Sequence, residues 1–306
     1  MMFDYLVKRV LQALLVLFVV TTVVFILLRG IGDPVKLLVS PEGTFEDYEN
    51  LQRMLGLDKP LIGQYMDYLS GIVKGDFGNS FFYNRPVLDL IKEHIPATLQ
   101  LSFAAIVIAI PFGIFSGIIS AVKRNTPIDS IVTTLSIAGR SVPSFWLGII
   151  LILIFSVWLK MLPASGYGKF KQIILPAITL SMGLLASTTR LTRSSMLDVL
   201  QQDYMTTARA KGVKEKGVIV FHGLRNALLT VVTMVALQIG NLLGGSVVVE
   251  SIFAWPGIGR LMVTAITNYD YPLVQACALV MAVIFTFLNF IVDILYTFID
   301  PRIRQS

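Results

Sequence analysis

Six stretches of this sequence contain no Asp, Glu, Lys or Arg, and each is at least 18 residues long. They are residues 10–28, 95–122, 141–159, 172–189, 226–249 and 271–292. A helix rises about 1.5 Å per residue, so about 18 or more apolar residues can cross a hydrocarbon core about 30 Å thick. Helices of soluble proteins average about 11–12 residues, which makes six buried core helices of this length an unlikely alternative. The sequence therefore predicts an all-α polytopic membrane protein with six transmembrane helices.

The basic residues predict how the chain is oriented. With the 66-residue segment 29–94 set aside, the hydrophilic segments on the side of the N-terminus hold 14 Lys and Arg, against 4 on the other side. Segments beyond about 60 residues cross largely regardless of charge, which is the reason for setting this one aside. We therefore expect a multi-pass protein with both termini cytoplasmic and residues 29–94 outside. The net charge of +6 then reflects orientation among membrane lipids, and no nucleic-acid partner is expected.

The outer segment 29–94 carries signals for short helices. Thr44 followed by Asp47 matches a capping box, and Gly56 supplies a stop. Pro60 then suits a first helical position, and Gly75 ends the second helix. We expect a small helical insertion whose apolar faces pack on the membrane helices, with contact to a partner protein as the alternative.

The third charge-free run contains a proline signal, and the fifth contains a signal from small residues. Pro143 predicts that residues 128–160 cannot form one unkinked helix. Arg140, just before it, is interpreted as lying at the membrane interface, with the wall of an internal aqueous path as the alternative. In the fifth run, a close helix–helix approach is predicted by the small residues Gly240, Gly244, Gly245 and Ser246.

The sequence offers no constellation for catalysis or metal binding. The glycine spacing before Val218 lacks the lysine of a phosphate-binding loop. With Cys277 as the only cysteine and His94 and His222 as the only histidines, a metal site rich in thiolate or imidazole cannot be assembled. Ser246 and His222 are predicted on opposite sides of the membrane, so they cannot act as nucleophile and base. We expect no enzyme activity, no cofactor and no metal.

The cytoplasmic segment 190–225, called the coupling segment below, holds seven Lys and Arg residues. Its apolar spacing predicts a helix from Ser194 that stops at Gly212. The exposed, narrow tip is expected at Tyr204, Ala208, Lys211 and Gly212. Such a helix could enter a cleft on a partner protein. Alternatively, it could lie on the bilayer surface, with Gly212 serving only as a helix cap.

Residues 203–228 read DYMTTARAKGVKEKGVIVFHGLRNAL. This stretch resembles the cytoplasmic EAA loop of permease subunits from binding-protein-dependent ABC importers. The branch is the one for dipeptides, oligopeptides, glutathione and nickel. Its pattern, D-Y-x-R-T-A-R-A-K-G followed by H-x-L-R-N-A-L, is matched except at Thr206, where Arg is usual. Further similar segments are 56–65, 75–80, 141–145, 190–196, 249–259 and 300–302.

This resemblance implies a type I ABC importer transmembrane domain in a prokaryotic inner membrane. It also implies a heterodimer with a second, homologous permease, two cytoplasmic ATPases that hydrolyse ATP, and an external substrate-binding protein. Alternating access would be driven through a coupling helix that docks into the ATPase. The residues carried over to that role are Asp203, Tyr204, Thr207, Ala208, Arg209, Ala210, Lys211, Gly212, His222 and Arg225.

The resemblance also suggests a second site and a division of the chain. Glu250 and the turn Trp255-Pro256-Gly257 are expected at the periplasmic mouth of the path, with an interfacial Trp anchor as the alternative. The expected parts are 1–28, the external segment 29–94, the permease core 95–299 containing the coupling segment, and the tail 300–306. A di- or oligopeptide is the favoured substrate; glutathione and a nickel chelate remain open, as does a stand-alone secondary transporter or channel.

Overall fold

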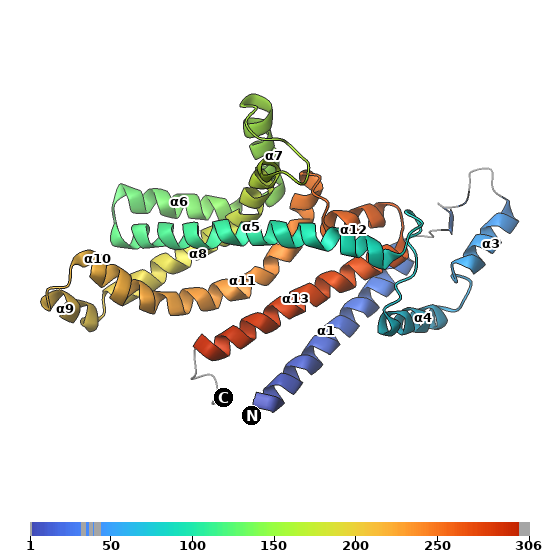
Figure 1. Ribbon diagram of the computed structural model, residues 1–306, viewed down its shortest axis with the longest axis horizontal. Helices are drawn as coiled ribbons and strands as arrows, with labels where there is room; N and C mark the ends of the chain where they lie inside the picture. The colour runs from blue at the N-terminus through green and yellow to red at the C-terminus, as the bar shows by residue number, and fades with distance from the viewer. Residues whose placement is uncertain (1, 32–34, 37–38, 40–43, 300–306) are drawn as a thin grey trace. The chain divides into compact units, whose positions relative to one another are not determined.

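The computed structural model describes residues 2–31, 35–36, 39 and 44–299. Its regular elements in these ranges are helices joined by turns and irregular segments, with one isolated bridge between Asn79 and Pro86 (Figure 1). Its first helices are α1 (Met2–Ile31), α3 (Phe45–Met54), α4 (Leu61–Lys74), α5 (Val87–Val122), α6 (Pro127–Ser141), α7 (Ser144–Leu151) and the π-helix η1 (Ile152–Trp158). They are followed by α8 (Phe170–Leu200), α9 (Asp203–Ala210), α10 (Glu215–Gly217), the π-helix η2 (Val218–Leu224), α11 (Arg225–Ile252), α12 (Ile258–Thr267) and α13 (Tyr271–Ile299).

The apolar runs lie in these helices. Within the described residues, four segments are long and apolar enough to cross a membrane, namely Val7–Gly30, Val87–Val122, Phe170–Leu200 and Tyr271–Val292. A fifth span results if Pro127–Ser141 (α6) and Ser144–Trp158 (α7 with η1) count as one. The two segments are bent by 107° at the break that contains Pro143, as the prediction of a kink there required. The run 226–249 lies within α11, a helix of 28 residues. The prediction of an all-α polytopic protein is confirmed.

The chain divides into two compact units. Unit 1 comprises Met1–Ala97 with Pro256–Thr286, and unit 2 comprises Thr98–Trp255 with Phe287–Ser306. In unit 1, the starts of α5 and α13 share an apolar cluster with α12, and its fully buried members include Val87, Ile258 and Leu273. The carboxylate of Asp270 is buried beside this cluster, where it accepts hydrogen bonds from the Ser80 hydroxyl and the Phe82 N–H.

The predicted helix signals of the outer segment are present in unit 1. Thr44 and Asp47 form the capping box, with the Thr44 N–H 2.8 Å from the Asp47 carboxylate. This hydrogen bond lowers the pKa of Asp47, because it stabilises the charged form. Gly75 ends α4 in the left-handed conformation at φ +72°. Arg29 at the end of α1 donates two hydrogen bonds to Gln64 of α4, which ties these two helices together.

Close helix packing in unit 2 occurs at glycines that the sequence reasoning did not single out. A Cβ added to Gly117 of α5 would lie 2.5 Å from the Cβ of Thr192 in α8, and one at Gly113 would lie 2.7 Å from the Cβ of Thr188. Gly245, in contrast, makes an ordinary contact with Leu180, and Gly244 faces open space. Ser246, another residue of the predicted set, is fully buried. Among the helical glycines of unit 2 for which this distance is known, the tightest approach is thus on α5, where Gly113 and Gly117 meet β-branched threonines of α8.

Candidate functional site

The coupling segment folds as two helices where one was expected. α8 extends through Ser194 to Leu200, and α9 starts three residues later at Asp203. Gln201 closes α8 with its N–H bonded to the Val199 carbonyl, and Gln202 then takes an extended ψ of 147°. The prediction of one helix up to Lys211 was therefore wrong. The turn allows α9 to fold back onto α8, so that apolar residues of both helices are buried together.

A small apolar cluster holds α9 in place. Met205 and Ala208 of α9 pack with Val218 of η2, and Val199 and Leu200 of α8 contact the same cluster. Ala208 is only 7% exposed, so it lies on the inner face of α9 and not at the tip where it was expected. The periodicity placed Ala208 on one face with Tyr204, but only the fold shows which face is covered. The inner face of α9 is therefore held by this cluster, while its outer face is exposed.

The remaining residues predicted for coupling are exposed. They are Asp203, Tyr204, Thr207, Arg209, Ala210, Lys211, Gly212, His222 and Arg225. Two polar contacts order this surface. The guanidinium of Arg209 pairs with Glu215 at 3.1 Å, and this hydrogen bond lowers the pKa of the Glu215 carboxyl. The amide of Asn226 donates to the Tyr204 hydroxyl at 3.3 Å, which links α9 to α11.

Gly212 follows α9 at its exposed C-terminal end. Its φ is +78°, the left-handed region in which a side chain strains the backbone, and a Cβ added there would meet nothing within 4 Å. The Gly212 N–H bonds the Arg209 carbonyl at 2.9 Å, which closes the last turn after α9. Gly212 is thus a helix cap, as expected, and the space beside it is open to whatever approaches α9.

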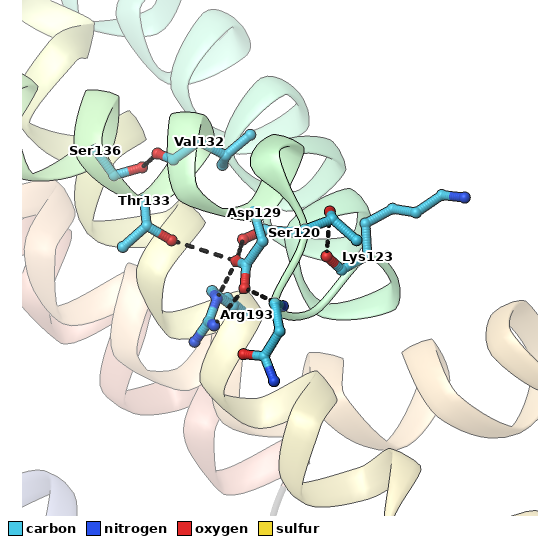
Figure 2. A network of polar contacts seen from close by, with 9 residues as sticks. Ser120, Lys123, Asp129, Val132, Thr133, Ser136 and Arg193 are labelled. Carbon is cyan, nitrogen blue, oxygen red and sulfur yellow. Dashed lines mark hydrogen bonds and ion pairs between the residues drawn. The ribbon is translucent and has the colours of Figure 1, made fainter.

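An ion pair between the buried Asp129 and the partly exposed Arg193 joins α6 to α8, and Arg193 lies within the coupling segment. Figure 2 shows Arg193 and Ser120 converging on the carboxylate of Asp129. The Arg193 Nε and Nη2 lie 2.7 and 2.8 Å from the two carboxylate oxygens, and the Ser120 hydroxyl donates at 2.5 Å. The Asn125 N–H adds a further hydrogen bond at 3.0 Å. Three helices, α5, α6 and α8, meet at this one carboxylate.

Sequence reasoning missed this ion pair. The only local signal is an acidic residue in the first turn of a helix that begins with Pro127, which is typical of helix starts. The partner Arg193 follows 64 residues later, and no spacing rule connects the two. Asp129 is 5% exposed, so its charge depends on these donors for compensation.

The residues predicted at the mouth of the path are buried in this structure. Glu250 is fully buried in unit 2, where its carboxylate accepts a hydrogen bond from the Thr98 hydroxyl at 2.8 Å. Trp255 is 1% exposed and stands edge-on to Tyr167, with ring centroids 4.9 Å apart. A buried Trp255 neither reaches outward at the mouth of the path nor faces lipid as an interfacial anchor. Gly257 is also buried, and it precedes the first residue of α12, while Pro256 is partly covered.

We predict that Trp255→Ala destabilises the protein. The substitution removes a large buried aromatic side chain and its contact with Tyr167, and such truncations cost about 3–5 kcal/mol. The thermal unfolding midpoint of the detergent-purified protein should fall clearly, whereas Trp255→Phe should fall less because it keeps an apolar ring. An unchanged midpoint in Trp255→Ala would show that this burial contributes little.

No group of three His, Cys, Asp or Glu side chains among the described residues could hold a metal ion. Cys277 is a buried free thiol in α13. The described part of the site therefore consists of exposed residues on α9 and buried residues that pack inside the chain, and it contains no cluster of metal ligands.

The chain matches two family models that together span almost its full length. Residues 91–305 match the binding-protein-dependent transport system inner membrane component, and residues 2–102 match the N-terminal part of such membrane components. The glutathione transport system permease protein GsiC of Escherichia coli K12 is 45% identical over 306 residues, with 100% of both chains covered. The protein of the same name from Shigella dysenteriae serotype 1 is similar to the same extent.

Two solved structures share the fold. An inward-facing structure of the MetNI methionine ABC transporter has a TM-score of 0.61 at 17% identity, and covers 70% of this chain and 97% of the other. A crystal structure of an amino acid ABC transporter with histidines has a TM-score of 0.54 at 15% identity, and covers 68% of this chain and 94% of the other. At these identities the likeness concerns the fold alone, which is that of a type I ABC importer transmembrane domain.

Proposed function

This chain belongs to the family of binding-protein-dependent transport system inner membrane components, and we propose that it forms half of an import path for short peptides, with glutathione as the first candidate. It is a permease subunit of an ABC importer in an inner membrane. The observation that carries the choice of substrate is the 45% identity to GsiC over the full length of both chains. A nickel chelate is the alternative within the same branch.

The proposed assembly contains a second permease of the same family, two cytoplasmic ATPases and an external binding protein. ATP hydrolysis is assigned to the ATPases, because this chain lacks a phosphate-binding loop. Both termini are proposed to be cytoplasmic, with the segment 29–94 outside and 95–299 as the permease core. The distribution of Lys and Arg supports this orientation.

The exposed face of α9 is proposed as the contact with the ATPase. Support comes from nine exposed residues of the predicted set, including the basic side chains Arg209, Lys211 and Arg225. The buried cluster of Met205, Ala208 and Val218 would transmit force, since it joins α9 to η2 and to the end of α8. Motion of the ATPases could then reach the membrane helices through α8.

The proposal is tested by reconstituting the full complex into vesicles and measuring uptake of labelled glutathione, a dipeptide, an oligopeptide and a nickel chelate. We expect glutathione to enter only with ATP, the ATPases and the binding protein all present. Co-purification of the second permease and the ATPases with this chain checks the assembly. Full uptake by this chain alone, without ATP, would instead support a stand-alone transporter.

A further inference from the structure

A pocket of about 230 Å³ opens in unit 2 where α6 bends into α7. α8 and α11 complete its walls. Its polar lining residues are Arg140, Ser144, Thr179 and Gln238, and its apolar ones include Leu180 and Leu242. Among the described residues that line it, Arg140 is the single charged one. The described part of the wall thus presents one positive charge.

The guanidinium of Arg140 is held in position but not neutralised. Its Nη1 donates to the Ser187 hydroxyl at 2.7 Å, and that hydroxyl in turn donates to the Gly183 carbonyl at 2.9 Å. An arginine has five N–H donors, so four are left. Among the described residues, none accepts a hydrogen bond from these four, and no carboxylate lies within ion-pair distance of Arg140. By contrast, Arg193 in the same unit is paired with Asp129.

An arginine in this setting favours a planar anion. The guanidinium matches a carboxylate with two parallel hydrogen bonds, and the neighbouring side chains of Leu180 and Leu242 are buried and apolar. Arg140 itself is exposed, so a ligand that enters the pocket can reach it. Ionisable groups close to membrane segments commonly mark a substrate path, and a ligand carboxylate would complement the charge of Arg140.

We propose that this pocket is a transport subsite in which Arg140 binds a carboxylate of the peptide substrate. This inference rests on the proposed function and adds the place and chemistry of recognition to it. Sites for whole small ligands have about 300–1,000 Å³, so a pocket of about 230 Å³ accommodates one end of the peptide. Ser187 acts as a positioning residue, because it touches the guanidinium and not the ligand.

Gly183 gives an independent means of testing the pocket. It lines the cavity, and a Cβ added there meets no atom within 4 Å, so a side chain can start at this position and is expected to extend into the pocket. Gly183→Leu should therefore block the subsite while Arg140 keeps its charge. Its φ is not in the left-handed region, so the substitution brings no backbone strain of that kind.

The first test uses the full importer in vesicles with labelled glutathione, and compares glutathione carried per ATP hydrolysed. We expect Arg140→Gln and Gly183→Leu each to lower this ratio at least tenfold, and Arg140→Lys to lower it less because the charge is kept. The matched control is Arg124→Gln, which changes an exposed arginine outside the pocket and should retain the wild-type ratio. Co-purification with the partners verifies that each variant assembles.

The second test reads binding directly. Ser144→Cys places a thiol in the pocket, and the native Cys277 is buried. S-methylglutathione, which has no free thiol, should slow alkylation of this cysteine, and the added Arg140→Gln change should remove the protection. Equal protection in both backgrounds, or wild-type transport by Arg140→Gln, would overturn the subsite and leave the proposed function standing. A wild-type importer that carries no peptide at all would overturn the proposed function, and the subsite with it.

Discussion

Gly212→Trp is expected to lower ATP-driven uptake at least tenfold while the importer still assembles. Gly212 lies at the exposed end of α9, and nothing lies within 4 Å of the position its Cβ would take. An indole there projects into solvent in the isolated chain, so folding should tolerate its bulk. In the complex the same indole would clash in the cleft proposed to receive α9. The readout is uptake per assembled importer, with co-purified ATPase as the measure of assembly.

Backbone strain has to be separated from bulk at this position. With φ at +78°, any L-residue costs about 1–2 kcal/mol, and Asn tolerates the left-handed region better than most. Gly212→Asn is therefore the matched control: it should keep most of the uptake, and Gly212→Ala should show the cost of strain without bulk. Wild-type uptake by a well-expressed Gly212→Trp protein would contradict the proposed docking of α9.

Removing either partner of the Asp129–Arg193 pair is expected to destabilise the protein strongly. Two hydrogen bonds of 2.7 and 2.8 Å join these side chains, and Asp129 is 5% exposed. Breaking a buried pair costs about 3–5 kcal/mol, and the cost here should lie toward the lower value because the Arg193 side chain is 28% exposed. Asp129→Asn should therefore lower the thermal unfolding midpoint of the detergent-purified importer, and Arg193→Leu should do so as well.

A double-mutant cycle checks that the effect belongs to the pair. Asp129→Asn combined with Arg193→Leu should be less destabilised than the sum of the two single variants, because no charge is then left alone. Asp67→Asn is the matched control, since Asp67 pairs with Lys59 at a similar 2.6 Å but both side chains are exposed. It should shift the midpoint little. Additive effects of Asp129→Asn and Arg193→Leu would show that the two residues act independently.

Local signals in the sequence determined the elements of this fold. Charge-free runs of 18 or more residues predicted the apolar helices, because crossing a hydrocarbon core demands length and apolarity from each segment separately. Thr44 and Asp47 predicted a helix start, Gly75 and Gly212 predicted helix ends, and Pro143 predicted the break after α6. Each of these signals depends on backbone geometry within a few residues, so it can be read without knowing the neighbours.

Residue motifs also predicted a coupling role for the segment 190–225, but they could not say which side of α9 is covered. Tyr204 and Ala208 are four residues apart and share a helix face by spacing, yet Tyr204 is exposed and Ala208 is buried. The turn at Gln201 and Gln202 decides this, because it folds α9 onto Val199 and Leu200. Spacing gives the faces of a helix, and only packing assigns one of them to the interior.

The tertiary structure alone decided how distant polar residues are used. Asp129 pairs with Arg193, which is 64 residues away in the sequence, and Glu250 is buried and accepts a hydrogen bond from Thr98. Arg140 lines a pocket, and four of its donors have no acceptor among the residues that the structure describes. In the sequence these are charged residues near the ends of apolar helices, and interfacial positions would suit them equally well. The free energy of a charge depends on its solvation and on the partners within a few ångströms, and the meeting of α5, α6, α8 and α11 sets both.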